Sequence, residues 1–256
     1  MATEDEPVDS RNSSDGKASH RLSLHVERLA PGVEHELPEG HSVLYVRAGT
    51  VTTFNAASEP VVRQANEAWR SRPPARLMSG AVTSWLDRWT LSPWRRPASV
   101  ARGNDRAAAS LGQAVATSVR VQQLSAKSAL MTKDVDFGQA KSCLLRCDRV
   151  DFPPGGEAYL HVHAGPGIRR LIAGSLRVDT NGASNEYGPG DFWFEEGPSP
   201  VYAAASIEHG ASFVRVLVLP VSYQGRSSIT YLREEDQLKP KHQRYSIFVD
   251  EVITLQ

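Results

Sequence analysis

Two histidines, His161 and His163, stand two residues apart in the run AYLHVH, and their spacing is the strongest chemical signal in the sequence. The run has the composition of a β-strand, in which side chains two apart point to the same face. Two neighbouring imidazoles on one face suit a divalent transition metal such as Fe, Ni, Zn, Mn or Cu. The alternative is that the pair is the polar lining of a metal-free pocket.

The elements that must position this pair are short strands. Runs of five to eight residues rich in large apolar and β-branched side chains recur along the chain, separated by the turn signals PPGG, AGPG, TNG and GPG. No helical periodicity lies between them, so the pattern predicts an all-β sandwich or barrel.

An internal repeat divides these strands into two sets. Leu24, Glu27 and Leu29 correspond to Leu145, Asp148 and Val150 at a constant offset, and VRAGTV at 46–51 corresponds to LIAGSL at 171–176. A repeat of this length indicates a duplicated domain. The alternative is a single larger sandwich whose strands resemble each other by chance.

The segment around the histidines resembles the cupin superfamily. Gly155, His161, His163 and Gly174 have the spacing of the first cupin motif, and Gly190-Asp191 begins a segment like the second. The resemblance implies a bicupin, with two antiparallel cupin-type β-barrels of jelly-roll topology. Two positions depart from the motifs: the resemblance places a metal-binding Glu at Gly167 and a third metal-binding His at Val201.

The resemblance also implies roles for nearby residues. In the cupin register Arg169 faces into the barrel, where it would clamp a carboxylate or phosphate, or pair with Glu195 or Glu196. One of these glutamates, Glu195 in the preferred assignment, would complete the metal site or serve as a base. The expected metal ligands are His161, His163 and Glu195, and the expected substrate-binding residues are Arg169, Tyr159 and Trp193.

Two functions are consistent with this site. The first is a metal-dependent enzyme acting on a small, anionic organic molecule, with the reaction class (dioxygenase, isomerase or lyase) left open because a fold does not fix chemistry. The second is a non-catalytic, metal-free bicupin that binds or senses a small molecule. The first barrel carries Glu36 and Pro38 at the two histidine positions, and we expect it to be a structural partner.

The expected domain order follows from the repeat and from composition. Residues 1–19 form an acidic tail expected to be disordered, 20–94 the first barrel, 95–118 a linker and 119–222 the barrel with the histidines. Residues 223–256 are expected to supply strands that pack on the other barrel or on a second subunit, as in a homodimer.

Residues 63–106 hold nine arginines and four of the five tryptophans. Such a segment could contact single-stranded nucleic acid, but we prefer tryptophans at a barrel mouth or interdomain surface. Its run VTSWLDRWTL is interpreted as a strand, with Trp85, Asp87 and Trp89 on one face and Leu86 and Arg88 on the other.

Bulk composition excludes several classes of protein. Of the 256 residues 40% are hydrophobic and the formal net charge is +0, so charge gives no reason to expect a nucleic-acid or membrane partner. No apolar run approaches the roughly 20 residues needed to cross a bilayer. The N-terminus lacks a signal-peptide pattern, and Cys143 and Cys147 are interpreted as reduced structural thiols. These features together predict a cytoplasmic protein.

Overall fold

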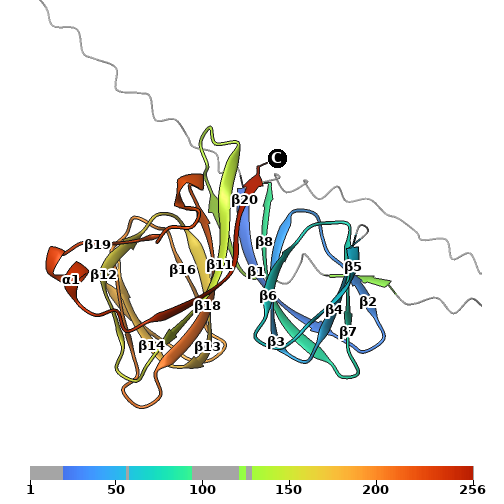
Figure 1. Cartoon of the computed structure of the whole chain (residues 1–256), viewed down its shortest axis with the longest axis horizontal. Helices are drawn as coiled ribbons and strands as arrows, with labels where there is room; N and C mark the ends of the chain where they lie inside the picture. Colours follow the sequence, from blue (N-terminus) through green and yellow to red (C-terminus); the bar gives the residue numbers. More distant parts are fainter. Residues whose placement is uncertain (1–19, 56–57, 94–120, 125–128, 256) are drawn as a thin grey trace, which may run out of the picture.

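The fold was obtained as a computed structural model, which describes residues 20–55, 58–93, 121–124 and 129–255. It consists of two β-barrels side by side, the first on the right and the second on the left in Figure 1. The predicted all-β class with two antiparallel barrels is therefore confirmed. The 1–19 tail and the 95–118 linker lie outside the described residues.

The first barrel is built from ten strands. They are β1 (His20–Leu29), β2 (Glu34–Glu36), β3 (His41–Ala48), β4 (Val51–Asn55), β5 (Ser58–Arg63), β6 (Ala68–Ser71), β7 (Ala75–Ser79), β8 (Ser84–Pro93), β9 (Val121–Gln123) and β10 (Ala129–Val135).

The second barrel contains ten strands and two short helical segments. They are β11 (Ser142–Phe152), β12 (Glu157–His163), β13 (Gly167–Gly174), β14 (Leu176–Thr180), β15 (Ala183–Tyr187), β16 (Phe192–Glu195), β17 (Val201–Ala205), β18 (Ala211–Leu219), η1 (Val221–Tyr223), β19 (Ile229–Tyr231), α1 (Glu234–Leu238) and β20 (Arg244–Thr254).

The two barrels share one topology. One sheet has the order β10-β1-β8-β3-β6 in the first barrel and β20-β11-β18-β13-β16 in the second. The other sheet has the order β9-β2-β7-β4-β5 in the first barrel and β19-β12-β17-β14-β15 in the second. Every strand of one barrel thus has a counterpart in the other, as a duplication requires and as a single sandwich does not.

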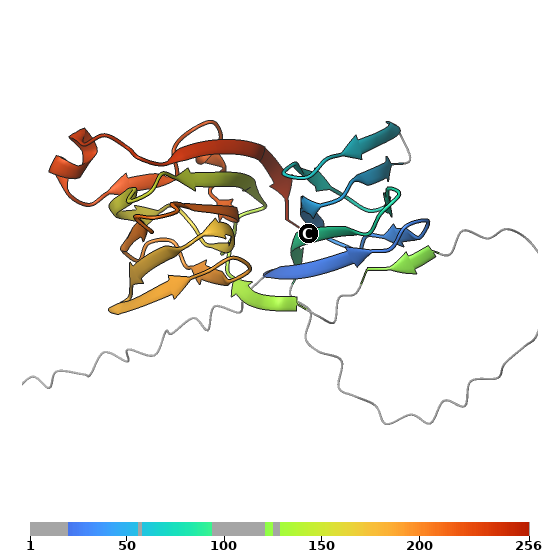
Figure 2. The ribbon, with the colours of Figure 1, turned by 90° about the horizontal axis from the view of Figure 1, so that it is seen from below.

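The shared topology corrects the boundary expected at residue 119. β10 pairs antiparallel with β1, and β9 pairs parallel with β2, so these two strands complete the first barrel. Their counterparts in the second barrel are β20, which pairs with β11, and β19, which pairs with β12. The tail therefore closes its own barrel, because the inner strands of each sheet need partners for their backbone groups. In Figure 2, β10 lies at the junction of the two barrels.

The sheets that face each other have two buried sides. One side lines its own barrel and the other forms a shared apolar core, to which β1, β3 and β8 contribute along with β11, β18 and β20. Trp89 of β8 lies in this core and donates its indole N–H to the carbonyl of Ile168 on β13, at 3.2 Å. Cys143 and Cys147 are buried there as free thiols.

The predicted faces of β8 are confirmed. Leu86 lies in the core of the first barrel and Trp89 in the shared core. Arg88 is buried with Glu27, to which its Nη2 donates at 2.6 Å. Burial of Trp69 and Trp89 removes two of the aromatic faces on which the nucleic-acid alternative depends. Trp94 and the basic residues beyond it lie outside the described part of the chain.

Candidate functional site

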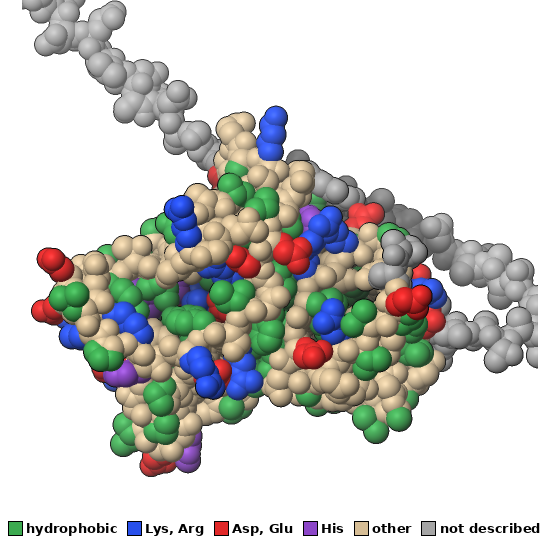
Figure 3. Space-filling view, in the orientation of Figure 1, with side chains coloured by type: hydrophobic (Ala, Val, Ile, Leu, Met, Phe, Trp, Pro, Cys, Tyr) green, Lys and Arg blue, Asp and Glu red, His purple; other side chains and the backbone are tan. Residues whose placement is uncertain are grey.

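The inner surface of the second barrel holds a small polar cavity. Five strands, β12, β13, β16, β18 and β20, supply its polar side chains, and the barrel end is hollowed in Figure 3, with basic and histidine side chains visible inside. The cavity volume is about 20 Å³, room for roughly one water molecule. Its polar lining consists of His161, His163, Arg169, Trp193, Glu195, Arg215 and Tyr245.

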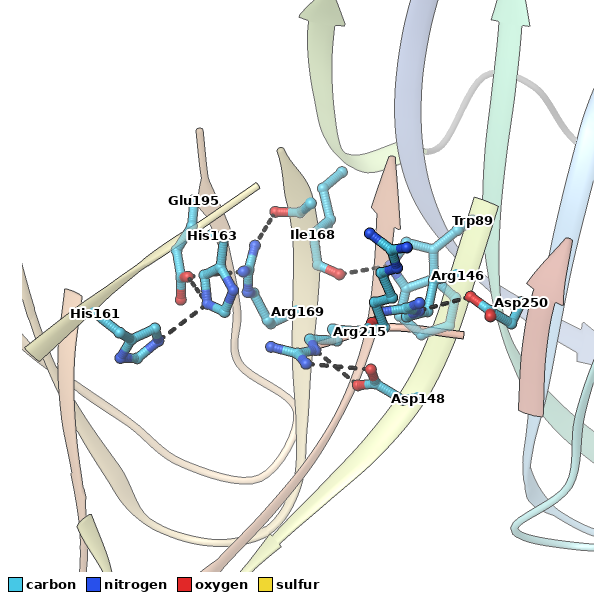
Figure 4. Close-up of polar contacts among 12 residues, drawn as sticks. Trp89, Arg146, Asp148, His161, His163, Ile168, Arg169, Glu195, Arg215 and Asp250 are labelled. Carbon is cyan, nitrogen blue, oxygen red and sulfur yellow. Dashed lines mark hydrogen bonds and ion pairs between the residues drawn. The ribbon is translucent and has the colours of Figure 1, made fainter. Parts of the chain in front are cut away.

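His161 and His163 point inward from β12, as strand alternation predicts. Both are buried, and their Nε2 atoms lie 3.2 Å apart (Figure 4). His161 Nδ1 lies 2.6 Å from the backbone carbonyl of Tyr159. A carbonyl only accepts, so Nδ1 of a neutral His161 carries the hydrogen and Nε2 carries a lone pair. The Nε2–H of His163 must then donate to His161, which leaves His163 Nδ1 without a hydrogen.

Glu195 enters the cavity from the end of β16, whereas Glu196 is exposed. Its Oε1 accepts the indole N–H of Trp193 at 2.8 Å. Its Oε2 lies 2.7 Å from Arg169 Nη2 and 3.1 Å from His163 Nε2. The Arg169–Glu195 contact is an ion pair without an aligned hydrogen bond, and His163, whose Nε2–H is directed to His161, only lies close to the carboxylate. The expected pairing of Arg169 with a glutamate is thus present.

The charges in the site follow from burial and from this ion pair. Burial lowers the pKa of His163 to about 3 despite the nearby Glu195, and burial also lowers the pKa of His161, so both rings are neutral at pH 7. Burial alone would raise the pKa of Glu195, but Arg169 and His163 hold it well below its usual range. Arg169, whose pKa burial lowers to about 10, stays charged. A neutral histidine pair therefore lies beside a buried ion pair.

A second buried ion pair continues the polar lining, and sequence reasoning missed it. Arg215 on β18 donates from Nε to Asp148 Oδ1 at 2.7 Å and from Nη2 to Oδ2 at 3.1 Å. The signal was present in the repeat, because Asp148 corresponds to Glu27, which pairs with Arg88 in the first barrel. Both barrels therefore pair this buried carboxylate with an arginine, although the arginines differ in position: Arg215 lies directly opposite Asp148, whereas Leu86 lies opposite Glu27.

The three predicted metal ligands lie together but do not fit a resident metal ion. Among the described residues there is no group of three or more His, Cys, Asp or Glu side chains able to hold one. Glu195 is engaged by Arg169 and Trp193. His163 would have to move its hydrogen to Nδ1, which has no hydrogen-bond partner, whereas the second nitrogen of a metal-bound histidine normally donates to one.

The two positions that depart from the cupin motifs are closed to additional ligands. Val201 lies opposite His161 in the β12–β17 register and is buried. A Cβ on Gly167 would lie 2.5 Å from Leu217 Cδ2 and 2.6 Å from the Val216 carbonyl oxygen, closer than atoms can pack. Arg169 Nη1 also donates to the Gly167 carbonyl at 2.6 Å. The arginine therefore occupies the space beside the position where the family motif has a glutamate.

The predicted substrate-binding residues do not all reach the cavity. Arg169 and Trp193 line it, but Tyr159 contributes only its backbone carbonyl, because its ring packs on the outer side against Lys239 and His242. The C-terminal segment instead supplies Ile229 and Tyr245 to the lining.

Besides the pairing of β19 with β12 and of β20 with β11, one arginine ties together the two ends of the tail that carries Ile229 and Tyr245. Buried Arg146 donates to Asp250 and to the backbone carbonyls of Tyr223 and Arg226, at 2.7, 2.7 and 2.8 Å. These bonds hold both ends of the tail against β11, so the segment that closes the cavity is itself anchored.

Helices long and apolar enough to cross a membrane are absent from the described residues.

Comparisons with known proteins identify the fold. No protein-family model matches the sequence, and no curated protein matches it. The formate complex of an oxalate decarboxylase from Lactobacillus farciminis is similar with a TM-score of 0.53 at 16% identity, over 87% of this chain and 82% of that one. A variant of the Bacillus subtilis oxalate decarboxylase has a TM-score of 0.54 at 12% identity, over 87% and 74%. These matches support the bicupin resemblance at the level of the fold.

Proposed function

We propose that the second barrel binds a small organic acid through Arg169, without a resident metal ion. The observation that carries this proposal is the unsatisfied hydrogen-bonding capacity of the cavity. Arg169 is 1% exposed, and its Nη2 lies 2.7 Å from Glu195 Oε2 without an aligned hydrogen bond, while His163 Nδ1 has no hydrogen-bond partner. Unpaired buried polar atoms are costly, so a polar guest that bridges them is favoured.

The chemistry of the lining selects the class of guest. A guanidinium presents a planar fork of donors that matches a carboxylate. The remaining wall is apolar and close, with Val201, Ala203 and Phe213 among its residues. A cavity of about 20 Å³ restricts the guest to a few atoms unless the tail residues Ile229 and Tyr245 move away. One of the similar structures is a formate complex, which makes formate, acetate and oxalate reasonable first probes.

Titration calorimetry with these three acids, in buffer containing a chelator, tests the proposal. The informative variant is Arg169→Lys, which keeps the charge but loses the fork, and its matched control is Arg177→Lys at a half-exposed arginine on β14. We expect saturable binding that weakens about tenfold, or about 1.4 kcal/mol, in Arg169→Lys only. No binding of any of the acids, or equal binding by the two folded variants, would refute the proposal.

A second candidate function is the metal-dependent enzyme. It is favoured by one observation. His163 Nε2 lies 3.2 Å from His161 Nε2 and 3.1 Å from Glu195 Oε2, so the three atoms are close together. It requires Glu195 to turn away from Arg169 and His163 to change tautomer. The result that would support this function is a stoichiometric transition metal in the purified protein that is absent from a His161→Ala/His163→Ala double variant.

A further inference from the structure

A groove runs between the two barrels, away from the cavity just described. Its volume is about 510 Å³, in the range of small-molecule sites. The first barrel contributes β3 and β8 to it, and the second contributes β13 and the turn before β16. The lining residues are Arg47, Ala48, Trp85, Arg170, Leu171, Ile172, Pro189 and Gly190.

Two arginines share a single buried carboxylate at the base of this groove. Arg47 Nε lies 3.1 Å and Arg170 Nε 3.4 Å from Asp87 Oδ1, and Asp87 is fully buried. Arg47, Arg170 and Asp87 together thus carry one excess positive charge. The next carboxylate, Asp191, accepts the backbone N–H of Gly188 at 2.8 Å and also interacts electrostatically with Arg170, so it offsets part of this excess.

The contacts between these groups are ion pairs without aligned hydrogen bonds. Both carboxylate oxygens of Asp87 and the Nε atoms of Arg47 and Arg170 are buried without a hydrogen-bond partner. Burial raises the pKa of Asp87 to about 6, in spite of the two neighbouring guanidiniums. The three groups therefore form a desolvated cluster held by charge alone, and an anion in the groove would give both arginines an acceptor.

An exposed aromatic ring lies beside the arginines. Trp85 is 40% exposed, and Arg47 Cζ lies 5.8 Å from the centroid of its ring. Trp89 on the same strand is 1% exposed in the shared core, so the strand can bury a tryptophan but leaves Trp85 open to the groove. Ile172 and Pro189 supply aliphatic walls.

We propose that this groove is a second ligand site, which binds an organic carboxylate with a flat apolar body. The carboxylate is held between Arg47 and Arg170, and the body packs on Trp85. A cation is disfavoured by the excess positive charge. An inorganic anion would leave the aromatic and aliphatic surface unused, and a neutral aromatic compound would leave both arginines without an acceptor.

Benzoate is the probe. Benzamide, which has the aromatic ring without the charge, and inorganic phosphate, which has the charge without the ring, are the comparators. Binding is followed by calorimetry and tryptophan fluorescence. We expect benzoate to bind more tightly than either comparator, and Arg47→Gln and Trp85→Ala each to weaken it about tenfold or more. Both side chains are partly exposed, so these variants should fold.

Two further variants separate a binding role from a structural one. Asp87→Asn removes the competing carboxylate while keeping its shape, and it should tighten benzoate binding. Arg177→Gln is the matched control, because Arg177 also pairs with an aspartate and lies 5.8 Å from the centroid of an aromatic ring, that of Tyr202. It should change nothing, and Arg169→Lys in the other cavity should also leave benzoate binding unchanged.

Several results would overturn the proposal. They are the absence of saturable benzoate binding, equal affinity for phosphate or benzamide, equal effects of Arg47→Gln and Arg177→Gln, and weaker binding by a folded Asp87→Asn protein. Loss of benzoate binding in Arg169→Lys would also count against it, since it would place the ligand in the barrel cavity.

Discussion

Replacing Glu195 with glutamine is the sharpest perturbation of the buried network. Glutamine keeps the size of the side chain but removes the charge opposite Arg169, whose side chain is 1% exposed and whose Nη2 lies 2.7 Å from the carboxylate. Removing one partner of a buried ion pair typically costs about 3–5 kcal/mol, because the other charge stays buried and uncompensated. We expect a loss of this size in the free energy of unfolding.

Chemical denaturation at pH 7 measures this loss, and two variants calibrate it. Asp179→Asn breaks an exposed ion pair with Arg177 and should cost no more than about 1 kcal/mol. The double variant Glu195→Gln/Arg169→Met removes both charges and should recover much of the stability, since apolar replacement of a buried pair is often neutral. A cost for Glu195→Gln that matches Asp179→Asn would refute this account of the network.

The pH dependence gives the same variant a second test. The pKa of Glu195 is depressed in the folded protein, so its carboxylate stabilises the fold above the unfolded pKa of about 4.3. That contribution is lost as the pH falls from there through the lower folded pKa. The difference between wild type and Glu195→Gln should therefore shrink below about pH 4, and a difference that grows in acid would contradict the assignment.

Three other predictions concern the surroundings of the site. Burial lowers the pKa of His163 to about 3, so between about pH 3 and pH 6.5 the unfolded chain binds more protons than the folded protein. The free energy of unfolding should therefore fall by about 1.4 kcal/mol per pH unit on acidification through this range. Chemical denaturation at several pH values should show a shallower fall for His163→Gln. Trp89→Phe loses the bond to the Ile168 carbonyl, and calorimetric unfolding should show about 1 kcal/mol or more of destabilisation. Arg146→Ala removes the ion-pair partner of Asp250 and the donor to the Tyr223 carbonyl, and hydrogen exchange should rise in residues 223–254 before it rises in the rest of the barrel.

The strand pattern and the repeat were sufficient to predict two barrels and the inward direction of His161 and His163, because alternation along a strand is a local property. The membership of β9 and β10 was not predictable in this way. Both follow a long segment without strand pattern, and their partners β2 and β1 are far away in the sequence. Short strands carry little information about which sheet they join.

The chemistry of the site was harder to predict than its location. The cupin resemblance implied that Arg169 lies beside the histidines, but whether Glu195 faces a metal or the guanidinium depends on the three-dimensional arrangement of β13 and β16. The Arg215–Asp148 pair joins residues on different strands, and only the repeat hinted at it. Tyr159 was misplaced because the register of β12 shifts between Ala158 and His161, so strict alternation does not hold there and the ring leaves the face that carries the histidines.

The central claim is that the cavity binds an organic acid without a metal ion. It is tested most directly by elemental analysis of protein purified from metal-supplemented medium, combined with oxalate titration of the same protein before and after chelator treatment. We predict less than a tenth of an equivalent of any transition metal (about one atom per ten chains) and the same oxalate affinity in both samples. One equivalent of metal that is absent from the His161→Ala/His163→Ala variant, together with oxalate binding that the chelator abolishes, would contradict the claim.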